Sequence, residues 1–149
     1  MSAERPGAVL FMCSMNAVRS PMAEALLRRA FGKSIYVASA GVRKGEADGF
    51  VRDVMEEVGA DVSKHRAKTL EELEDWEGLS FDLVISLSPE AHHRALELTR
   101  TNAIDVEYWP TMDPTLEQGS REQRLEAYRM ARDGLWKRIR QRFVTATGS

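Results

Sequence analysis

Short apolar segments of strand length alternate with segments of helical periodicity along this 149-residue chain. The first of them, residues 8–12, is apolar throughout, as expected for a strand that is buried on both faces. Three more strands are predicted at residues 35–38, 83–87 and, more weakly, 105–109. Because strands that alternate with helices pair in parallel, the pattern predicts an α/β fold with helices on both faces of a parallel sheet.

Local capping signals indicate where the helices begin and end. Ser20-Pro21 is interpreted as the N-cap and the first residue of a helix that ends at Gly32. Two shorter helices are predicted over residues 49–58, ending at Gly59, and over residues 89–98. The last helix is predicted to begin at the capping box Ser120-x-x-Gln123. Its apolar stripe consists of Leu125, Tyr128, Ala131, Leu135 and Ile139.

The length and composition indicate one domain over residues 1–149, with an ordered core at about 7–144 and a frayed tail at 145–149. The net charge of −2 gives no indication of a nucleic-acid partner. The single cysteine excludes an intramolecular disulfide, and no apolar stretch approaches the roughly 20 residues that cross a bilayer. We therefore expect a cytoplasmic protein with no nucleic-acid or membrane partner.

The segment between the first strand and the first helix carries the most specific chemistry. Ligands of parallel sheets bind at the carboxyl ends of the strands, where backbone N–H groups of this segment can surround an anion. Arg19 supplies a planar cationic fork for two phosphate oxygens. The same positive field favours thiolate over thiol at Cys13, and the Ser20 hydroxyl can stabilise that thiolate. A lone cysteine is more often a small buried hydrophobe, but the flanking strand and helix start favour the nucleophile here. The predicted substrate-binding loop comprises Ser14, Met15, Asn16, Ala17, Val18 and Arg19.

These residues and three later motifs resemble the low-molecular-weight protein tyrosine phosphatases and their relatives, the thioredoxin-coupled arsenate reductases. The resemblance covers essentially the whole chain. The longest matching segment runs from Val9 through Cys13 and Arg19-Ser20-Pro21 to Glu24. The further motifs are Ser39-Ala40-Gly41, Ser63-Lys64-His65-Arg66-Ala67 and Asp113-Pro114.

The resemblance implies a three-layer sandwich with a four-stranded parallel sheet, and a phosphatase mechanism without metal or cofactor. Cys13 would attack phosphorus while Asp113 protonates the leaving oxygen, and Asp113 would then activate water to hydrolyse the phosphocysteine. A simple turn at Asp-Pro is the alternative interpretation of Asp113. The catalytic set is thus Cys13, Arg19, Asp113 and Ser20. The expected ligands are phosphorylated proteins, small aryl phosphates, and oxyanions such as phosphate, sulfate and arsenate.

The same resemblance implies a left-handed backbone at Asn16, held by polar contacts to Ser20, Ser39 and His65. Asparagine tolerates that conformation best among the residues other than glycine. His65 is expected to support the loop and not to act as a base.

Several departures from the family pattern bear on the substrate. Met15 stands in place of the usual glycine, and Val18 in place of a second loop cysteine. Thr115-Leu116 follow Asp-Pro where aromatic residues are usual, which weakens the expectation of a phosphotyrosine substrate. Arg43 and Lys44 are expected to be solvated charges, with attraction of an anionic substrate as the alternative.

Two alternatives to a phosphatase remain open. The C-terminal third resembles the arsenate reductases more closely, but Ser88 lies roughly where their first relay cysteine falls, so only an external small thiol could complete that reaction. The second alternative is a non-catalytic oxyanion-binding module. His92-His93 are not expected to bind a metal, and Trp76, Trp109 and Trp136 are expected to be packing residues.

Overall fold

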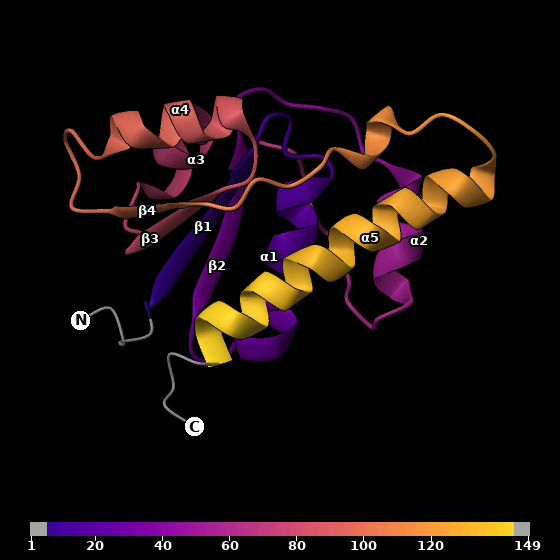
Figure 1. The fold of residues 1–149 in the computed structure, drawn as a ribbon. Helices are drawn as coiled ribbons and strands as arrows, with labels where there is room; N and C mark the ends of the chain where they lie inside the picture. The colour runs from indigo at the N-terminus through magenta and orange to yellow at the C-terminus, as the bar shows by residue number, and fades with distance from the viewer. Residues whose placement is uncertain (1–5, 145–149) are drawn as a thin grey trace.

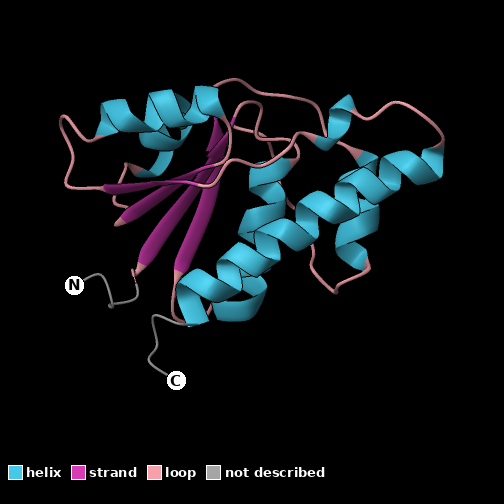
Figure 2. Ribbon diagram, viewed as in Figure 1, coloured by secondary structure: helices cyan, strands magenta, loops and turns pink. Residues whose placement is uncertain are grey.

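A computed structural model describes residues 6–144 and has a sheet of four parallel strands between two layers of helices (Figures 1 and 2). The order of the strands across the sheet is β2-β1-β3-β4. The strands are β1 (Ala8–Cys13), β2 (Tyr36–Gly41), β3 (Leu83–Ser86) and β4 (Asp105–Tyr108). The helices are α1 (Arg19–Phe31), α2 (Gly49–Glu56), α3 (Leu70–Glu77), α4 (Pro89–Leu98), η1 (Pro114–Leu116), α5 (Arg121–Ile139) and η2 (Arg140–Val144). The predicted three-layer α/β fold is therefore confirmed. The predicted tail at 145–149 lies outside the described residues.

The central strand β1 explains the uninterrupted apolar run. Val9 and Phe11 pack with α1, α2 and α5 on one face, whereas Leu10 and Met12 pack with α3 and α4 on the other. Both faces are buried, so no position along β1 is left for a polar side chain. β1 pairs with β2 up to the register of Cys13 with Gly41, which brings Cys13 to the carboxyl edge of the sheet.

The start of α1 differs from its prediction. The helix begins at Arg19, and its N-cap is Val18, which makes no side-chain capping bond. Ser20 lies inside the helix with its side chain fully buried, so its interpretation as the N-cap is wrong. Tertiary contacts of the Ser20 hydroxyl, described below, replace the capping role.

Helix α3 has no counterpart among the predicted helices. Its start has a complete capping box, in which Thr69 and Glu72 exchange hydrogen bonds of 3.1 Å. Trp76 near the end of this helix is 65% exposed, so its expected packing role is wrong. Trp109, by contrast, is buried with its ring edge-on to Phe11 at 6.1 Å between centroids.

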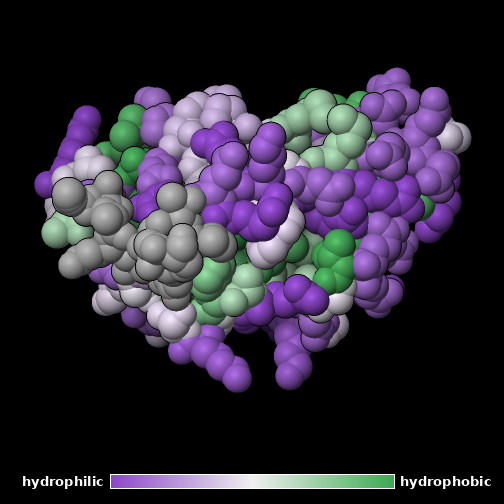
Figure 3. Space-filling model, turned by 60° about the horizontal axis from the view of Figure 1, so that its bottom comes forward, coloured by the Kyte–Doolittle hydropathy of each residue, from purple (hydrophilic) through white to green (hydrophobic). Residues whose placement is uncertain are grey.

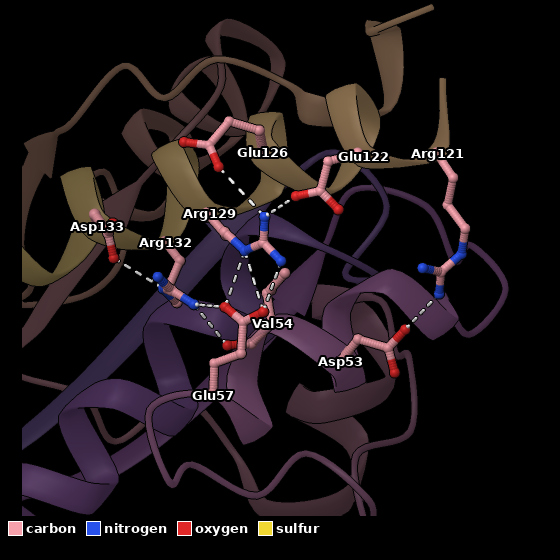
Figure 4. A network of polar contacts seen from close by, with 9 residues as sticks. All are labelled: Asp53, Val54, Glu57, Arg121, Glu122, Glu126, Arg129, Arg132 and Asp133. Carbon is pink, nitrogen blue, oxygen red and sulfur yellow. Dashed lines mark hydrogen bonds and ion pairs between the residues drawn. The ribbon is translucent and has the colours of Figure 1, made fainter. Parts of the chain in front are cut away.

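Helix α5 confirms the predicted capping box and the predicted apolar stripe, all five residues of which are buried. A network of charged side chains then joins α5 to the end of α2 (Figure 4). Glu57 accepts hydrogen bonds from Arg129 at 2.9 Å and from Arg132 at 2.7 Å. These two bonds lower the pKa of Glu57 to about 2. The side of the molecule shown in Figure 3 is mostly hydrophilic, with small separate apolar areas. Between residues 6 and 144, no helix is both long and apolar enough to cross a membrane.

Candidate active site

The loop from Cys13 to Arg19 connects the end of β1 to the start of α1 at the carboxyl edge of the sheet. The chain that follows β2 holds it from outside. Val42, Arg43 and Gly45 donate backbone hydrogen bonds of 2.8–3.2 Å to three successive loop carbonyls, those of Cys13, Ser14 and Met15. Within residues 6–144, no hydrogen bond joins the backbone N–H groups of residues 15–18 to a protein acceptor. Free N–H groups at a helix N-terminus are suited to binding an anion.

Arg19, at the end of this loop, is held in place by a contact that the sequence did not predict. Its Nη1 donates a 2.9 Å hydrogen bond to the carbonyl of Thr111, and its Nη2 lies 3.8 Å from Oδ2 of Asp113. Only 11% of the Arg19 side chain is exposed. The guanidinium is therefore positioned before any ligand arrives, which lowers the entropic cost of binding an oxyanion.

The Cys13 thiol is 2% exposed, and its Sγ lies 3.0 Å from Oγ of Ser20. Asn16, with a left-handed φ of 52°, donates from Nδ2 to Ser20 and to Ser39, both at 2.9 Å. Ser39 in turn donates to the carboxylate of Glu24. The resemblance predicted the contacts of Asn16 to Ser20 and Ser39, and the structure brings these groups together.

Glu24 was missed as a site residue, although its spacing offered a signal. It follows Ser20 by one helical turn on α1, so both side chains face the loop. A carboxylate only accepts hydrogen bonds, so Ser39 must donate to Glu24 and accept from Asn16. Ser20 also accepts from Asn16, which leaves the hydroxyl proton of Ser20 available to Cys13 Sγ.

His65 supports the loop from the segment between α2 and α3. Its Nε2 lies 2.9 Å from the carbonyl oxygen of Asn16, which only accepts, so Nε2 carries the proton. Burial lowers the pKa of His65 and favours the neutral ring. The backbone N–H of Lys68 donates to Oδ1 of Asn16 at 2.9 Å and fixes the orientation of that amide. Every donor and acceptor of the Asn16 side chain is thus used.

Asp113 lies after β4 and reaches the cavity from the opposite side to the loop. Its Oδ1 accepts from the N–H of Thr115 at 3.0 Å and from the hydroxyl of Thr115 at 2.7 Å. Oδ2 makes no such bond and faces Arg19, so Oδ2 is the oxygen available for proton transfer. The cavity encloses about 200 Å³, and its lining includes Cys13, Met15, Arg19, Glu46, Asp48 and Asp113.

The rim of this cavity is apolar but not aromatic at the positions where the family pattern is altered. Met15 is 39% exposed and lines the cavity, and Met112 and Leu116 flank Asp113 with most of their surface exposed. The Arg43 and Lys44 side chains are more than half exposed, as expected for solvated charges. Each also pairs with an acidic side chain of another helix, Arg43 with Glu90 and Lys44 with Glu72.

Ser88 and His92 have structural partners. Ser88 Oγ lies 3.0 Å from Ser14 Oγ, so the predicted position of a relay cysteine is next to the residue that follows Cys13. His92 stacks on Tyr108 with 4.4 Å between centroids and lies 2.9 Å from Ser86 Oγ. In the part of the chain that the structure describes, no three His, Cys, Asp or Glu side chains are grouped to hold a metal.

Comparison with known proteins agrees with this geometry. The model of the family "Low molecular weight phosphotyrosine protein phosphatase" matches residues 8–142. An arsenate reductase of Halalkalibacterium halodurans is 31% identical over 89% of this chain and 91% of its own length. The "Probable low molecular weight protein-tyrosine-phosphatase EpsP" of Ralstonia solanacearum is 45% identical over 42% of this chain and 44% of its own length.

A solved structure titled "An arsenate reductase in the phosphate binding state" superposes with a TM-score of 0.70 at 27% identity. The match covers 93% of this chain and 98% of that one. The chain is thus similar to relatives that are named for two different reactions. The chain belongs to the low molecular weight phosphotyrosine protein phosphatase family.

Proposed function

We propose that this protein is a cysteine-dependent phosphatase that hydrolyses phosphomonoesters through a phosphocysteine intermediate. The observation that carries the proposal is the convergence of Cys13, Arg19 and Asp113 on one small cavity. A neighbouring residue forms a hydrogen bond to each of the three: Ser20 to the thiol, Thr111 to the guanidinium and Thr115 to the carboxyl group.

In the first step, the Cys13 thiolate forms a bond to phosphorus as the bond to the leaving oxygen breaks. Arg19 and the free loop N–H groups hold the non-bridging oxygens, and protonated Asp113 gives its proton to the leaving oxygen. In the second step, Asp113 takes a proton from water, whose oxygen bonds to phosphorus while the P–S bond breaks. The sulfur leaves as a thiolate, which the hydroxyl proton of Ser20 stabilises.

A phosphorylated protein or a small aryl phosphate is the proposed substrate, held in the loop as an oxyanion. The chemistry at Cys13 requires only the phosphoryl group, whereas specificity depends on the rim. Because Met15 presents thioether surface to the cavity and none of the described residues that line it is aromatic, the rim favours apolar contact with the leaving group over ring stacking.

Arsenate reduction with an external small thiol is the second candidate, favoured by the similarity to arsenate reductases along most of the chain. Cys13 would displace an oxygen of arsenate as water. A small thiol would then attack Cys13 Sγ, and the S–As electron pair would stay on arsenic, which leaves as arsenite. A second thiol would reduce the resulting mixed disulfide and release Cys13. The chain holds one cysteine, so both thiols must come from solution.

One side-by-side experiment tests these functions. Purified protein is assayed with p-nitrophenyl phosphate, and separately with arsenate plus glutathione. Phosphatase turnover that disappears in Cys13→Ala supports the proposal. Thiol-dependent arsenate reduction without phosphatase turnover would establish the second candidate. A wild-type protein that binds phosphate but turns over neither substrate would be an oxyanion-binding module.

A further inference from the structure

A second cavity, of about 370 Å³, lies between α1, the segment 61–68 and α3. It shares no lining residue with the cavity at Cys13. Its volume is at the lower end of the range of roughly 300–1,000 Å³ that is typical of small-molecule sites. The proposed catalytic steps use no ligand at this place, so the cavity needs a separate explanation.

The charge of its lining is positive although the chain as a whole is negative. Lys64, Arg66 and Lys68 line the cavity, and none of them forms an ion pair with a described carboxylate. The lining also includes two carboxylates and a fourth cation, Arg28. Glu24 pairs with Arg28, and Asp61 accepts from the N–H of Ser63 at 2.8 Å, so the cations outnumber the carboxylates. Three unpaired cations around one concave surface favour an anionic ligand.

The aromatic ring of Trp76 completes the lining from α3. This side chain is 65% exposed, and no aromatic or cationic group among residues 6–144 is stacked on it. A large ring left in water at the edge of a cationic cavity can stack on a planar group. The ring and the cations together favour a ligand that carries both a planar ring and negative charge.

We propose that this cavity binds a nucleotide, with the base against Trp76 and the phosphates against Lys64, Arg66 and Lys68. A nucleotide combines the two required features within the volume of the cavity. The chain as a whole is negative, and these cations surround a cavity of about 370 Å³, which favours a small ligand over a nucleic acid.

The position of the cavity couples it to the candidate active site. His65 lines the cavity and also binds the carbonyl of Asn16, while Lys68 lines it and donates its N–H to the Asn16 side chain. A bound nucleotide therefore touches the segment that holds the loop in its left-handed turn. This makes the cavity a regulatory site for the loop.

Calorimetric titration of ATP into the Arg19→Ala variant tests the proposal, because that variant disables the anion site of the loop. We expect saturable binding, together with NMR shifts at the amides of residues 61–68 and at the side-chain amide of Asn16. Trp76→Ala, and separately Lys64→Ala with Lys68→Ala, should each weaken binding by about tenfold. The matched control removes two lysines outside the cavity, Lys33→Ala with Lys137→Ala, and should leave binding unchanged. Adenosine and tripolyphosphate should each bind at least about tenfold more weakly than ATP.

Three results would overturn the proposal: no ATP binding at millimolar concentration, equal binding of tripolyphosphate, or tighter binding of a single-stranded oligonucleotide. All of these tests measure binding, and none of them measures phosphatase activity. The nucleotide site can therefore be rejected while the proposed function stands, and the reverse is also true.

Discussion

The backbone N–H of Lys68 donates to Oδ1 of Asn16 at 2.9 Å, and this contact orients the amide whose Nδ2 donates to Ser20 and to Ser39. Ser39 can accept there because its own proton goes to the carboxylate of Glu24. Ser20 accepts from Asn16, so its hydroxyl proton is left for Cys13 Sγ, 3.0 Å away. Glu24 thus supports, through Ser39, the amide that directs the Ser20 proton to the thiol.

Replacing Glu24 with Gln should therefore slow reactions of Cys13. The Gln amide can donate to Ser39, whose oxygen would then have to accept from it and from Asn16 at once, and this weakens the contact that holds the Asn16 amide. We expect alkylation of Cys13 by iodoacetamide at pH 7, and turnover, to slow severalfold. Arg28→Gln is the matched control, because it removes the cation paired with Glu24 and leaves the carboxylate in place. Alkylation at the wild-type rate in a folded Glu24→Gln protein would show that Glu24 does not support the thiol through Ser39 and Asn16.

Asp113→Asn should slow hydrolysis most for substrates with poor leaving groups. A leaving oxygen of high basicity needs the proton, whereas nitrophenolate departs without it. We expect a loss of about 10²-fold or more for phenyl phosphate and a much smaller loss for p-nitrophenyl phosphate. Thr115→Val serves as the control, since it removes the 2.7 Å bond to Oδ1 but keeps the carboxyl group. Equal slowing of both substrates would reject Asp113 as the acid.

The stability of the protein should fall as the pH drops below about 6.5, partly because of His65. Burial lowers the pKa of His65 in the folded state, so the unfolded chain takes up a proton there before the folded one does. The contribution is fully present above the unfolded pKa and is lost on acidification, by at most about 1.4 kcal/mol per pH unit. Urea denaturation at pH 7.5 and 5.5 measures the corresponding change in the free energy of unfolding. The His65→Gln variant keeps a hydrogen-bond donor for the Asn16 carbonyl, and His92 and His93 are unchanged. Its loss of stability between pH 7.5 and 5.5 should be smaller than that of the wild type. An equal loss would show that His65 does not contribute to the pH dependence.

The network around Glu57 should stabilise the packing of α2 against α5 (Figure 4). We expect Glu57→Gln to lower the free energy of unfolding by about 1 kcal/mol at pH 7, since the carboxylate is partly exposed and water screens the pairs. The pKa of Glu57 is lowered to about 2, so its contribution is present above the unfolded value near 4.5 and disappears as the pH falls toward 2. The neighbouring Glu56 is exposed and forms no ion pair with another of residues 6–144, so Glu56→Gln is the control. Equal stabilities of the two variants at pH 7 would argue against the network.

The features that could be predicted from the sequence are those encoded by neighbours in the chain. The apolar strand ends at Cys13 and the helix begins at Arg19, so these two residues lie at opposite ends of one short loop. This placement does not depend on the remainder of the fold. The capping box at Ser120 and the stripe of α5 are local in the same sense, and both are confirmed. Helix α3 carried a readable signal at Thr69 and Glu72 that was overlooked.

Local signals failed where a distant group competes for the same side chain. Ser20 has the sequence context of an N-cap, but its hydroxyl contacts Cys13 and Asn16 instead. The partners of Arg43 and Lys44, which are Glu90 and Glu72, could not be predicted because they stand on other helices.

The loop sequence alone thus determined an anion-binding turn with a thiol and a guanidinium. Only the tertiary structure decided what orients them: Lys68 and Ser39 around Asn16, Thr111 behind Arg19, and Asp113 beside Arg19. The physical reason is that hydrogen bonds and ion pairs act over a few ångströms in space. The separation of two residues along the chain does not determine that distance; the packing of the helices and strands does.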